Sequence, residues 1–262
     1  MQFMLNTNNH LSFTLETANS DTIILCIHGV LGSPGQFKDF ANKLNEHNFS
    51  VKSILLPGHG SKGKEFAFIK PDNWQTFVNE EVARLKKKYQ HIYLFGHSLG
   101  GLLALNTSLT QSINGIILLN TPIYTRITWH QISLSLRVLL SSKNNNDPVL
   151  QIYRDSFGVN INDWWTLPFW IPRLLDVQRI GQKTLKILDE INIPVLIIQS
   201  LQDETVNPKS AEIFHQQLIH HQGSIHYLVK SMHAYFDLQE TQNIVDQINR
   251  FINEILFKSH LK

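Results

Sequence analysis

The segment Gly96-His97-Ser98-Leu99-Gly100 places a serine between two glycines, at a spacing that suits nucleophilic catalysis. The apolar run His91–Phe95 comes directly before it, and the helix-like run Leu99–Leu109 follows. A serine between a buried strand and a helix can occupy a sharp, strained turn, because small neighbours do not collide there. Such a turn exposes the serine hydroxyl beyond the end of the strand. The pattern therefore predicts that Ser98 is a nucleophile.

A serine hydroxyl needs a base that accepts its proton, and the base needs an acid that orients it. Asp203 follows the apolar run Pro194–Gln199, and His233 follows the strand-like run Ser224–Val229. Loops at the carboxyl ends of parallel strands meet at one edge of a sheet, so residues far apart in sequence can come together there. We therefore expect Asp203 to be the acid and His233 to be the base.

Other acids and histidines lie close to these candidates in the sequence. Glu204 and Asp237 stay open as alternatives for the acid. His97 lies on the tight turn beside the serine and His226 lies inside a predicted strand, and both are poor positions for the base. No cysteine or carboxylate completes a ligand set at metal-site spacing with the candidate metal-binding histidines of the C-terminal part, which are His215, His220, His221 and His226. The sequence predicts no metal site.

Two backbone N–H groups are needed to stabilise the negative charge that develops on a substrate's carbonyl oxygen. One is expected from Leu99, the residue directly after the nucleophile. The other is expected from Val30, which lies in a loop after the apolar run Thr22–Ile27. Gly29 precedes it and lets the backbone approach closely. Leu99 and Val30 are therefore the predicted oxyanion donors.

Short apolar runs alternate with helical stretches and would hold these residues in place. The runs are nearly continuous in apolar residues, which is typical of strands covered on both faces. Helix start signals occur at Ser33-Pro34-Gly35-Gln36 and Asp72-Asn73-Trp74-Gln75, which predict helices over 34–47 and 73–89. Further elements are one or two antiparallel edge strands within residues 1–17, a helix that starts at Asn207-Pro208, and an amphipathic helix over Asn243–Phe257. The remaining predicted strands are Val51–Leu56 and Gly115–Leu119. The order predicts an α/β fold with a mostly parallel, doubly wound sheet.

The stretch 124–188 interrupts this alternation and is too long for an ordinary connection. It contains a candidate amphipathic helix over Ile127–Leu140 and an aromatic cluster formed by Trp164, Trp165, Phe169 and Trp170. We expect residues 124–188 to form an inserted helical cap, and residues 1–123 with 189–262 to form the core. The aromatic cluster is expected in the core of the cap, and its tryptophans are candidates for the wall of a substrate pocket.

The composition excludes several functional classes. The 262 residues carry a net charge of +2, and only 17% of them are charged, so a nucleic-acid binder with a concentrated basic face is not expected. The lone cysteine, Cys26, cannot form a disulfide within the chain. Residues 1–10 lack the pattern of a signal peptide, and no apolar run reaches the roughly 18 residues of a membrane-spanning helix. We expect a cytoplasmic protein without a membrane span.

These motifs together resemble the α/β-hydrolase superfamily, specifically the bacterial carboxylesterases and monoacylglycerol lipases. The resemblance rests on His28-Gly29, Leu56-Pro57-Gly58-His59-Gly60, the Gly96–Gly101 segment, Asp203 and His233. Two further stretches, Pro71–Trp74 and Asp203–Ala211, are similar to small thermostable-type carboxylesterases with a short cap. The resemblance implies the α/β-hydrolase fold, with the roles already assigned to Ser98 and its partners. His59 is expected to hold a loop beneath the site through its ring nitrogens.

The expected function is that of a serine carboxylesterase that hydrolyses short- to medium-chain esters through an acyl-enzyme, without a cofactor or a metal. A monoacylglycerol lipase, a thioesterase, an acyltransferase and an amidase use the same residues and remain alternatives. A small-molecule ester is the expected partner. The sequence leaves open whether the protein is a monomer or a dimer.

Overall fold

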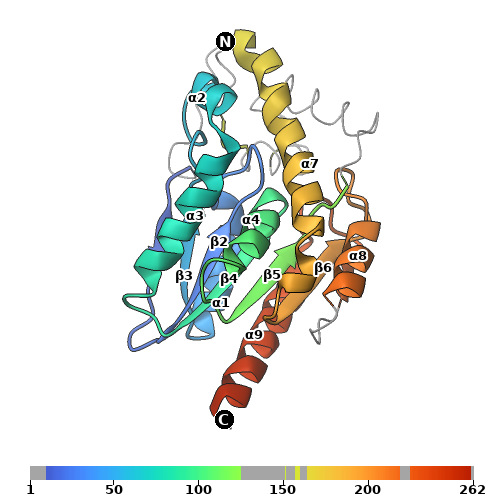
Figure 1. Cartoon of the computed structure of the whole chain (residues 1–262). Helices are drawn as coiled ribbons and strands as arrows, with labels where there is room; N and C mark the ends of the chain where they lie inside the picture. Colours follow the sequence, from blue (N-terminus) through green and yellow to red (C-terminus); the bar gives the residue numbers. More distant parts are fainter. Residues whose placement is uncertain (1–9, 125–150, 152–156, 160–163, 219–224, 261–262) are drawn as a thin grey trace.

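A computed structural model describes residues 10–124, 151, 157–159, 164–218 and 225–260. The described part contains a seven-stranded sheet with helices on both faces (Figure 1). The strands are β1 (Phe13–Leu15), β2 (Thr22–Ile27), β3 (Ser50–Ile54), β4 (His91–His97), β5 (Gly115–Leu119), β6 (Val195–Ser200) and β7 (Ile225–Leu228). The predicted α/β class with a mostly parallel sheet is confirmed.

The spatial order of the strands is β1-β3-β2-β4-β5-β6-β7. Every neighbouring pair is parallel except β1 and β3, which pair antiparallel with Phe13 opposite Ser53. The strand that carries the Gly-x-Ser-x-Gly segment, β4, therefore lies in the centre of the sheet, and β7 lies at one edge. The antiparallel edge strand expected near the N-terminus is β1.

Alternate side chains of each central strand pack on opposite faces of the sheet. In β2, Ile23, Leu25 and Ile27 contribute to one apolar cluster, whereas Ile24 and Cys26 contribute to the other. The first cluster lies under α3 (Pro71–Leu85), α4 (Leu99–Ser108), α7 (Ile171–Leu185) and α8 (Lys209–Gln217), and the second under α1 (Lys38–Glu46) and α9 (Leu238–His260). Helices cover both faces of the sheet, which explains why the strands are continuous apolar runs in the sequence.

The helix starts differ in part from the expectation. The first helical segment begins as a short 3₁₀ turn, η2 (Pro34–Phe37), before α1, and the Ser33 side chain makes no capping hydrogen bond. The next helix, α3, begins at Pro71 with Lys70 at the N-cap, so the capping box at Asp72 was wrong. Proline fixes its own φ angle and has no N–H to satisfy, which favours the helix start at Pro71. A short helix that the sequence analysis missed, α2 (Gly63–Phe68), precedes it.

The described part of the 124–188 stretch ends in helices that pack on the core. These are η3 (Trp164–Trp170) and α7, followed by the 3₁₀ turn η4 (Leu188–Glu190). Asn106 of α4 donates from Nδ2 to Thr184 Oγ1 of α7 at 2.7 Å. The helix expected over Ile127–Leu140 lies outside the described residues. The division into core and cap stays a prediction.

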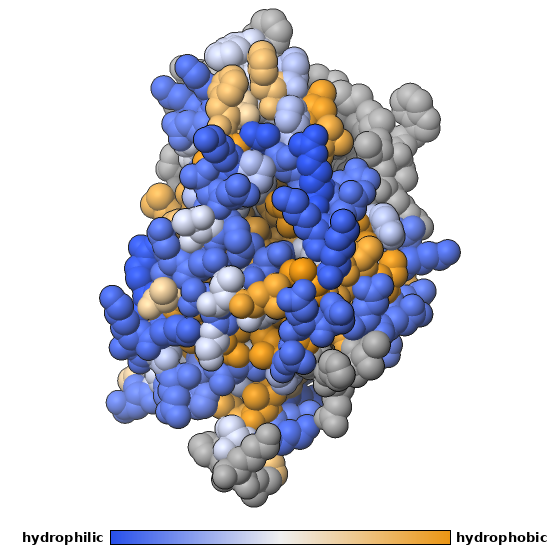
Figure 2. Space-filling model, in the orientation of Figure 1, coloured by the Kyte–Doolittle hydropathy of each residue, from blue (hydrophilic) through white to orange (hydrophobic). Residues whose placement is uncertain are grey.

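The face seen in Figure 2 is largely hydrophilic, with apolar side chains at the end where α2 and the start of α7 lie and in further patches across the middle and lower parts of the view. The rings of Phe68 in α2 and Phe169 in η3 are 5.7 Å apart, and both side chains are exposed. None of the helices in the described ranges is both long and apolar enough to cross a membrane.

Candidate active site

Ser98 occupies the sharp turn between β4 and α4. Its backbone angles, φ of 53° and ψ of −119°, lie outside the regions that residues other than glycine ordinarily adopt. Its N–H donates to the carbonyl of Leu119 in β5 at 2.9 Å, which fixes the turn against the sheet. A Cβ at Gly100 would overlap the carbonyl of Ile27 in β2, so only glycine fits there. The glycine spacing thus reflects the close approach of α4 to the sheet.

Asp203 and His233 form a buried pair in the loops after β6 and β7. Asp203 Oδ2 lies 2.9 Å from His233 Nδ1, and the Asp203 side chain is fully buried. Its other oxygen, Oδ1, accepts the N–H groups of Thr205 at 2.8 Å and Val206 at 2.7 Å. The carboxylate is therefore held by its own loop while it faces the imidazole.

The charge of Asp203 governs the protonation of His233. Burial alone lowers the pKa of His233, but the Asp203 carboxylate at hydrogen-bond distance and, more weakly, Glu204 favour the charged ring. The result is a pKa above the ordinary value for histidine. A carboxylate that stabilises a positively charged imidazole is what a general base needs when it accepts a proton.

The two alternative acids make other contacts. Glu204 Oε2 accepts the backbone N–H of His233 at 3.0 Å rather than facing its ring. Asp237 Oδ1 accepts the N–H groups of Gln239 and Glu240 at the start of α9. Of the three acids, the structure brings Asp203 to the His233 ring.

His97 links the serine turn to the His233 loop. Its Nε2 donates to the carbonyl of His233 at 2.9 Å, and the centroids of the two rings are 4.7 Å apart. Burial and the neighbouring His233 lower the pKa of His97 to about 3, so its ring is neutral. Ser98 and His233 therefore lie at the same edge of the sheet, although no hydrogen bond joins Ser98 Oγ to His233 Nε2 among the described residues. Such bonds are often long without substrate.

The two predicted oxyanion donors lie at the start of α4 and in the loop after β2. In the described part of the chain, neither Leu99 N–H nor Val30 N–H donates a hydrogen bond. The next donor along the loop, Leu31 N–H, is taken by His59 Nε2 at 3.2 Å. Burial lowers the pKa of His59 to about 4, so the neutral ring can accept this bond. The predicted role of His59 as a loop-holding residue is confirmed.

The tryptophans assigned to a pocket have different surroundings. Trp170 is buried, donates from Nε1 to the Gly63 carbonyl at 3.0 Å and packs edge-on against Phe66 of α2. Trp165 is about half exposed, at 49%. The side chain of Trp164 lies outside the described residues. Whether these side chains line a substrate pocket stays a prediction.

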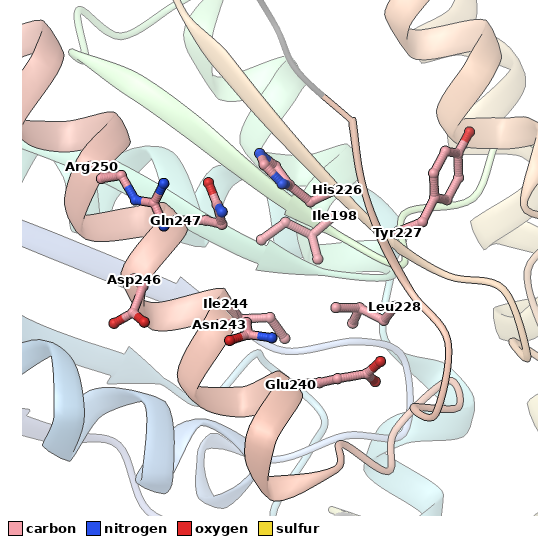
Figure 3. A pocket seen from close by; sticks show the side chains of 10 residues that line it. All are labelled: Ile198, His226, Tyr227, Leu228, Glu240, Asn243, Ile244, Asp246, Gln247 and Arg250. Carbon is pink, nitrogen blue, oxygen red and sulfur yellow. The ribbon is translucent and has the colours of Figure 1, made fainter.

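A cavity of about 190 Å³ lies away from these residues, between β7 and α9. Figure 3 shows that its wall is made by mostly polar side chains of α9, by the edge strand and by Ile198 of β6, with Glu240 at one end. Neither Ser98, Asp203 nor His233 lines it.

Glu240 and Asn120 hold the loop of His233 and were not anticipated. Glu240 accepts hydrogen bonds from the N–H groups of Val229, Lys230 and Ser231, and from Ser231 Oγ. Asn120, in a left-handed conformation at the end of β5, donates to the carbonyls of Met232 and His233. The sequence offers only a weak signal, an asparagine directly after a strand.

Comparisons with known proteins identify a matching family and two relatives. A family model described as "Serine aminopeptidase, S33" matches residues 18–242. The chain is 22% identical over 87% of its length to a carboxylesterase of Bacillus subtilis, covering 90% of that protein. It is 26% identical over 82% of its length to a thermostable monoacylglycerol lipase of Bacillus sp. strain H-257, covering 84% of it.

A solved structure shows the same fold. It comes from the description of LipS and LipT, two metagenome-derived lipolytic enzymes, and superposes with a TM-score of 0.73. The two chains share 18% identity, over 94% of this chain and 98% of the other. The chain is therefore an enzyme with the α/β-hydrolase fold and belongs to the serine aminopeptidase S33 family of hydrolases.

Proposed function

We propose that the protein is a serine carboxylesterase that hydrolyses short- to medium-chain carboxylic esters. One observation carries the proposal. The buried pair of Asp203 and His233 lies at the sheet edge to which the strained turn presents Ser98. An acid–imidazole pair beside a serine on such a turn suits acyl transfer through a covalent intermediate. The relatives named carboxylesterase and monoacylglycerol lipase support an ester as the substrate.

The reaction proceeds in two halves. Ser98 Oγ attacks the ester carbonyl while His233 Nε2 accepts its proton, and the carbonyl oxygen becomes an oxyanion that the N–H groups of Leu99 and Val30 stabilise. The carbon–oxygen bond to the alcohol then breaks, and His233 gives the proton to the leaving alcohol. Water attacks the acyl-enzyme, with His233 again as the base, and releases the carboxylic acid and free Ser98. Loss of one oxyanion donor typically costs about 100- to 1,000-fold in rate.

The proposal includes a substrate pocket beneath the cap. The proposed cap spans residues 124–188, and its tryptophans would supply an apolar wall for the acyl chain. A monoacylglycerol lipase is the nearest alternative, since one relative has that name. Hydrolysis of thioesters, acyl transfer and hydrolysis of amides remain further alternatives. The family description names an aminopeptidase, which would cleave an amide. We further propose that the substrate is a small-molecule ester and that the protein is located in the cytoplasm.

Hydrolysis of p-nitrophenyl acetate, butyrate, octanoate and palmitate tests the proposed substrate class. We expect the highest kcat/KM with the short or medium chains, as the proposed substrate class requires. An aminoacyl p-nitroanilide serves as the matched amide substrate. A maximum at palmitate would move the assignment to a lipase, and faster cleavage of the anilide than of any ester would move it to a peptidase.

The pH dependence of kcat/KM should report the protonation of His233. Its pKa is raised above the usual value of about 6.5. The base acts only when it is neutral, so kcat/KM should fall as the pH drops through this raised pKa, with a midpoint above about 6.5. His97 and His59 cannot produce this limb, because their pKa values are about 3 and about 4. A rate that is flat between about pH 6 and 8 would contradict His233 as the base.

A further inference from the structure

The main chain of His233 is held from both sides by side chains of the three strand ends beside it. Its N–H donates to Glu204 Oε2 at 3.0 Å. Its carbonyl accepts from His97 Nε2 at 2.9 Å and from Asn120 Nδ2 at 3.0 Å. His97 ends β4, Asn120 follows β5 and Glu204 follows β6. We call these three side chains the His233 clamp.

The clamp fixes the main chain of His233, which the hydrogen bond between Asp203 and the His233 ring does not do. That bond fixes one ring nitrogen, but an imidazole held at a single atom can still swing about it and carry Nε2 away from the serine. The position of the main chain removes this freedom, because it fixes the point from which the ring extends. A misplacement of about 1 Å in a reacting group can cost about 100-fold in rate.

The conformation and surroundings of Asn120 suit it to hold the main chain of His233. It is fully buried and its φ of 47° lies in the left-handed region, which asparagine tolerates better than most residues. Its Oδ1 accepts the N–H of Ser200 at 2.8 Å, which sets the orientation of the amide. Nδ2 then faces the carbonyls of both Met232 and His233. A carboxylate of the same size would place an oxygen against these carbonyls.

Glu204 adds a charge as well as an acceptor. The residue is 8% exposed, and its carboxylate favours the charged form of His233. The other groups that face His233 are Asp203, which also favours the charged form, and His97, which is neutral above about pH 3. Removal of the Glu204 charge should therefore change the titration of the base, whereas removal of its hydrogen bond should change the position of the base.

We propose that Glu204 and Asn120 are positioning residues for the catalytic base, and that they act by holding the peptide groups on either side of His233. The inference rests on the proposed function, in which His233 is the base. In this proposal Glu204, the neighbour of Asp203, binds the main chain of His233 rather than its ring.

Two substitutions separate the hydrogen bond of Glu204 from its charge. Glu204→Ala removes both, and we expect kcat to fall by about 10- to 100-fold with KM nearly unchanged. Glu204→Gln keeps an acceptor for the His233 N–H, so kcat should largely recover. In both variants the acid limb of kcat/KM should move to lower pH, by roughly half a pH unit, because one negative charge near the imidazolium is lost. Glu254→Gln, at an exposed position of α9, is the matched control and should behave as wild type.

Asn120→Asp tests the other side of the clamp. The substitution keeps the size and the left-handed backbone preference, but it replaces the donor with an acceptor. We expect kcat to fall by at least about 10-fold and the rate of Ser98 labelling by a fluorophosphonate to fall with it. Measurement of the melting temperature and of the far-UV spectrum shows whether the variant is folded. If it is not, Asn120→Ser, with a shorter side chain and no negative charge, replaces it, and its kcat is expected to fall similarly.

The outcomes distinguish this inference from the proposed function. A wild-type protein without serine-dependent ester hydrolysis would contradict the proposed function itself. A hydrolytically active wild type would overturn the clamp alone if its folded Glu204→Ala variant kept the wild-type kcat and acid limb and its folded Asn120 variant kept the wild-type kcat. Equal losses in Glu204→Ala and Glu204→Gln, without a shift of the acid limb, would also overturn it.

Discussion

Replacement of Ser98 by alanine should abolish ester hydrolysis, with kcat lower by at least about 10,000-fold. The substitution removes the atom that forms the acyl-enzyme, and neither Asp203 nor His233 can replace it. The fold should persist, because the Ser98 N–H that donates to Leu119 remains and a Cβ already exists at this position. A fluorophosphonate probe should label the wild type at Ser98 and leave the variant unlabelled, as intact-protein mass spectrometry would show.

Ser108→Ala is the matched control for this substitution. Ser108 lies at the other end of the same helix, α4, where its hydroxyl donates to the Leu105 carbonyl. The control should retain wild-type hydrolysis and labelling. Persistent hydrolysis in a purified Ser98→Ala protein would show that the nucleophile is another residue or an activated water.

Asp203→Asn should lower kcat by about 10,000-fold while the protein stays folded. Both carboxylate oxygens of Asp203 act as acceptors, one for Thr205 and Val206 and the other for His233. An asparagine has one acceptor and one NH₂ group, so an orientation that satisfies the loop turns the NH₂ group toward His233 Nδ1. The imidazole then carries its proton on Nε2 and cannot accept the serine proton.

The pH profile and the thermal stability complete this test. The acid limb should move to lower pH in Asp203→Asn, because the nearest negative charge to His233 is lost. Asp189→Asn, at an exposed position, should change neither property. Near wild-type turnover in folded Asp203→Asn would show that another carboxylate orients the base.

Strands β2 to β7 could be predicted from the sequence to within two residues at each end, because a strand depends on local pattern. Two predicted runs match their strands in full, Thr22–Ile27 for β2 and Gly115–Leu119 for β5. Strands that are buried between two helical layers contain few polar residues. The serine turn was predictable for a similar reason, since the fit of α4 against the sheet requires glycine. Asp203 and His233 followed from their positions after strands.

The supporting hydrogen bonds of the site could not be predicted in the same way. Glu240 reaches the loop of His233 from the start of α9, and Asn120 reaches it from β5. These partners are joined only by the tertiary structure, and no spacing along the chain specifies them. The start of α3 at Pro71 rather than at a capping box shows the same limit on a smaller scale, because two adjacent start signals compete.

With His233 as the proposed base, the place of β7 in the sheet would make catalytic activity depend on local unfolding. This strand has four residues, lies at the edge and pairs with β6 alone in the described sheet, yet the loop after it carries His233. Edge elements with few hydrogen bonds open at a lower free energy than the centre of a domain. Opening of this edge would withdraw the base while β4 and the serine turn remain folded. On heating, the enzyme would therefore lose activity reversibly below the temperature at which the sheet itself melts.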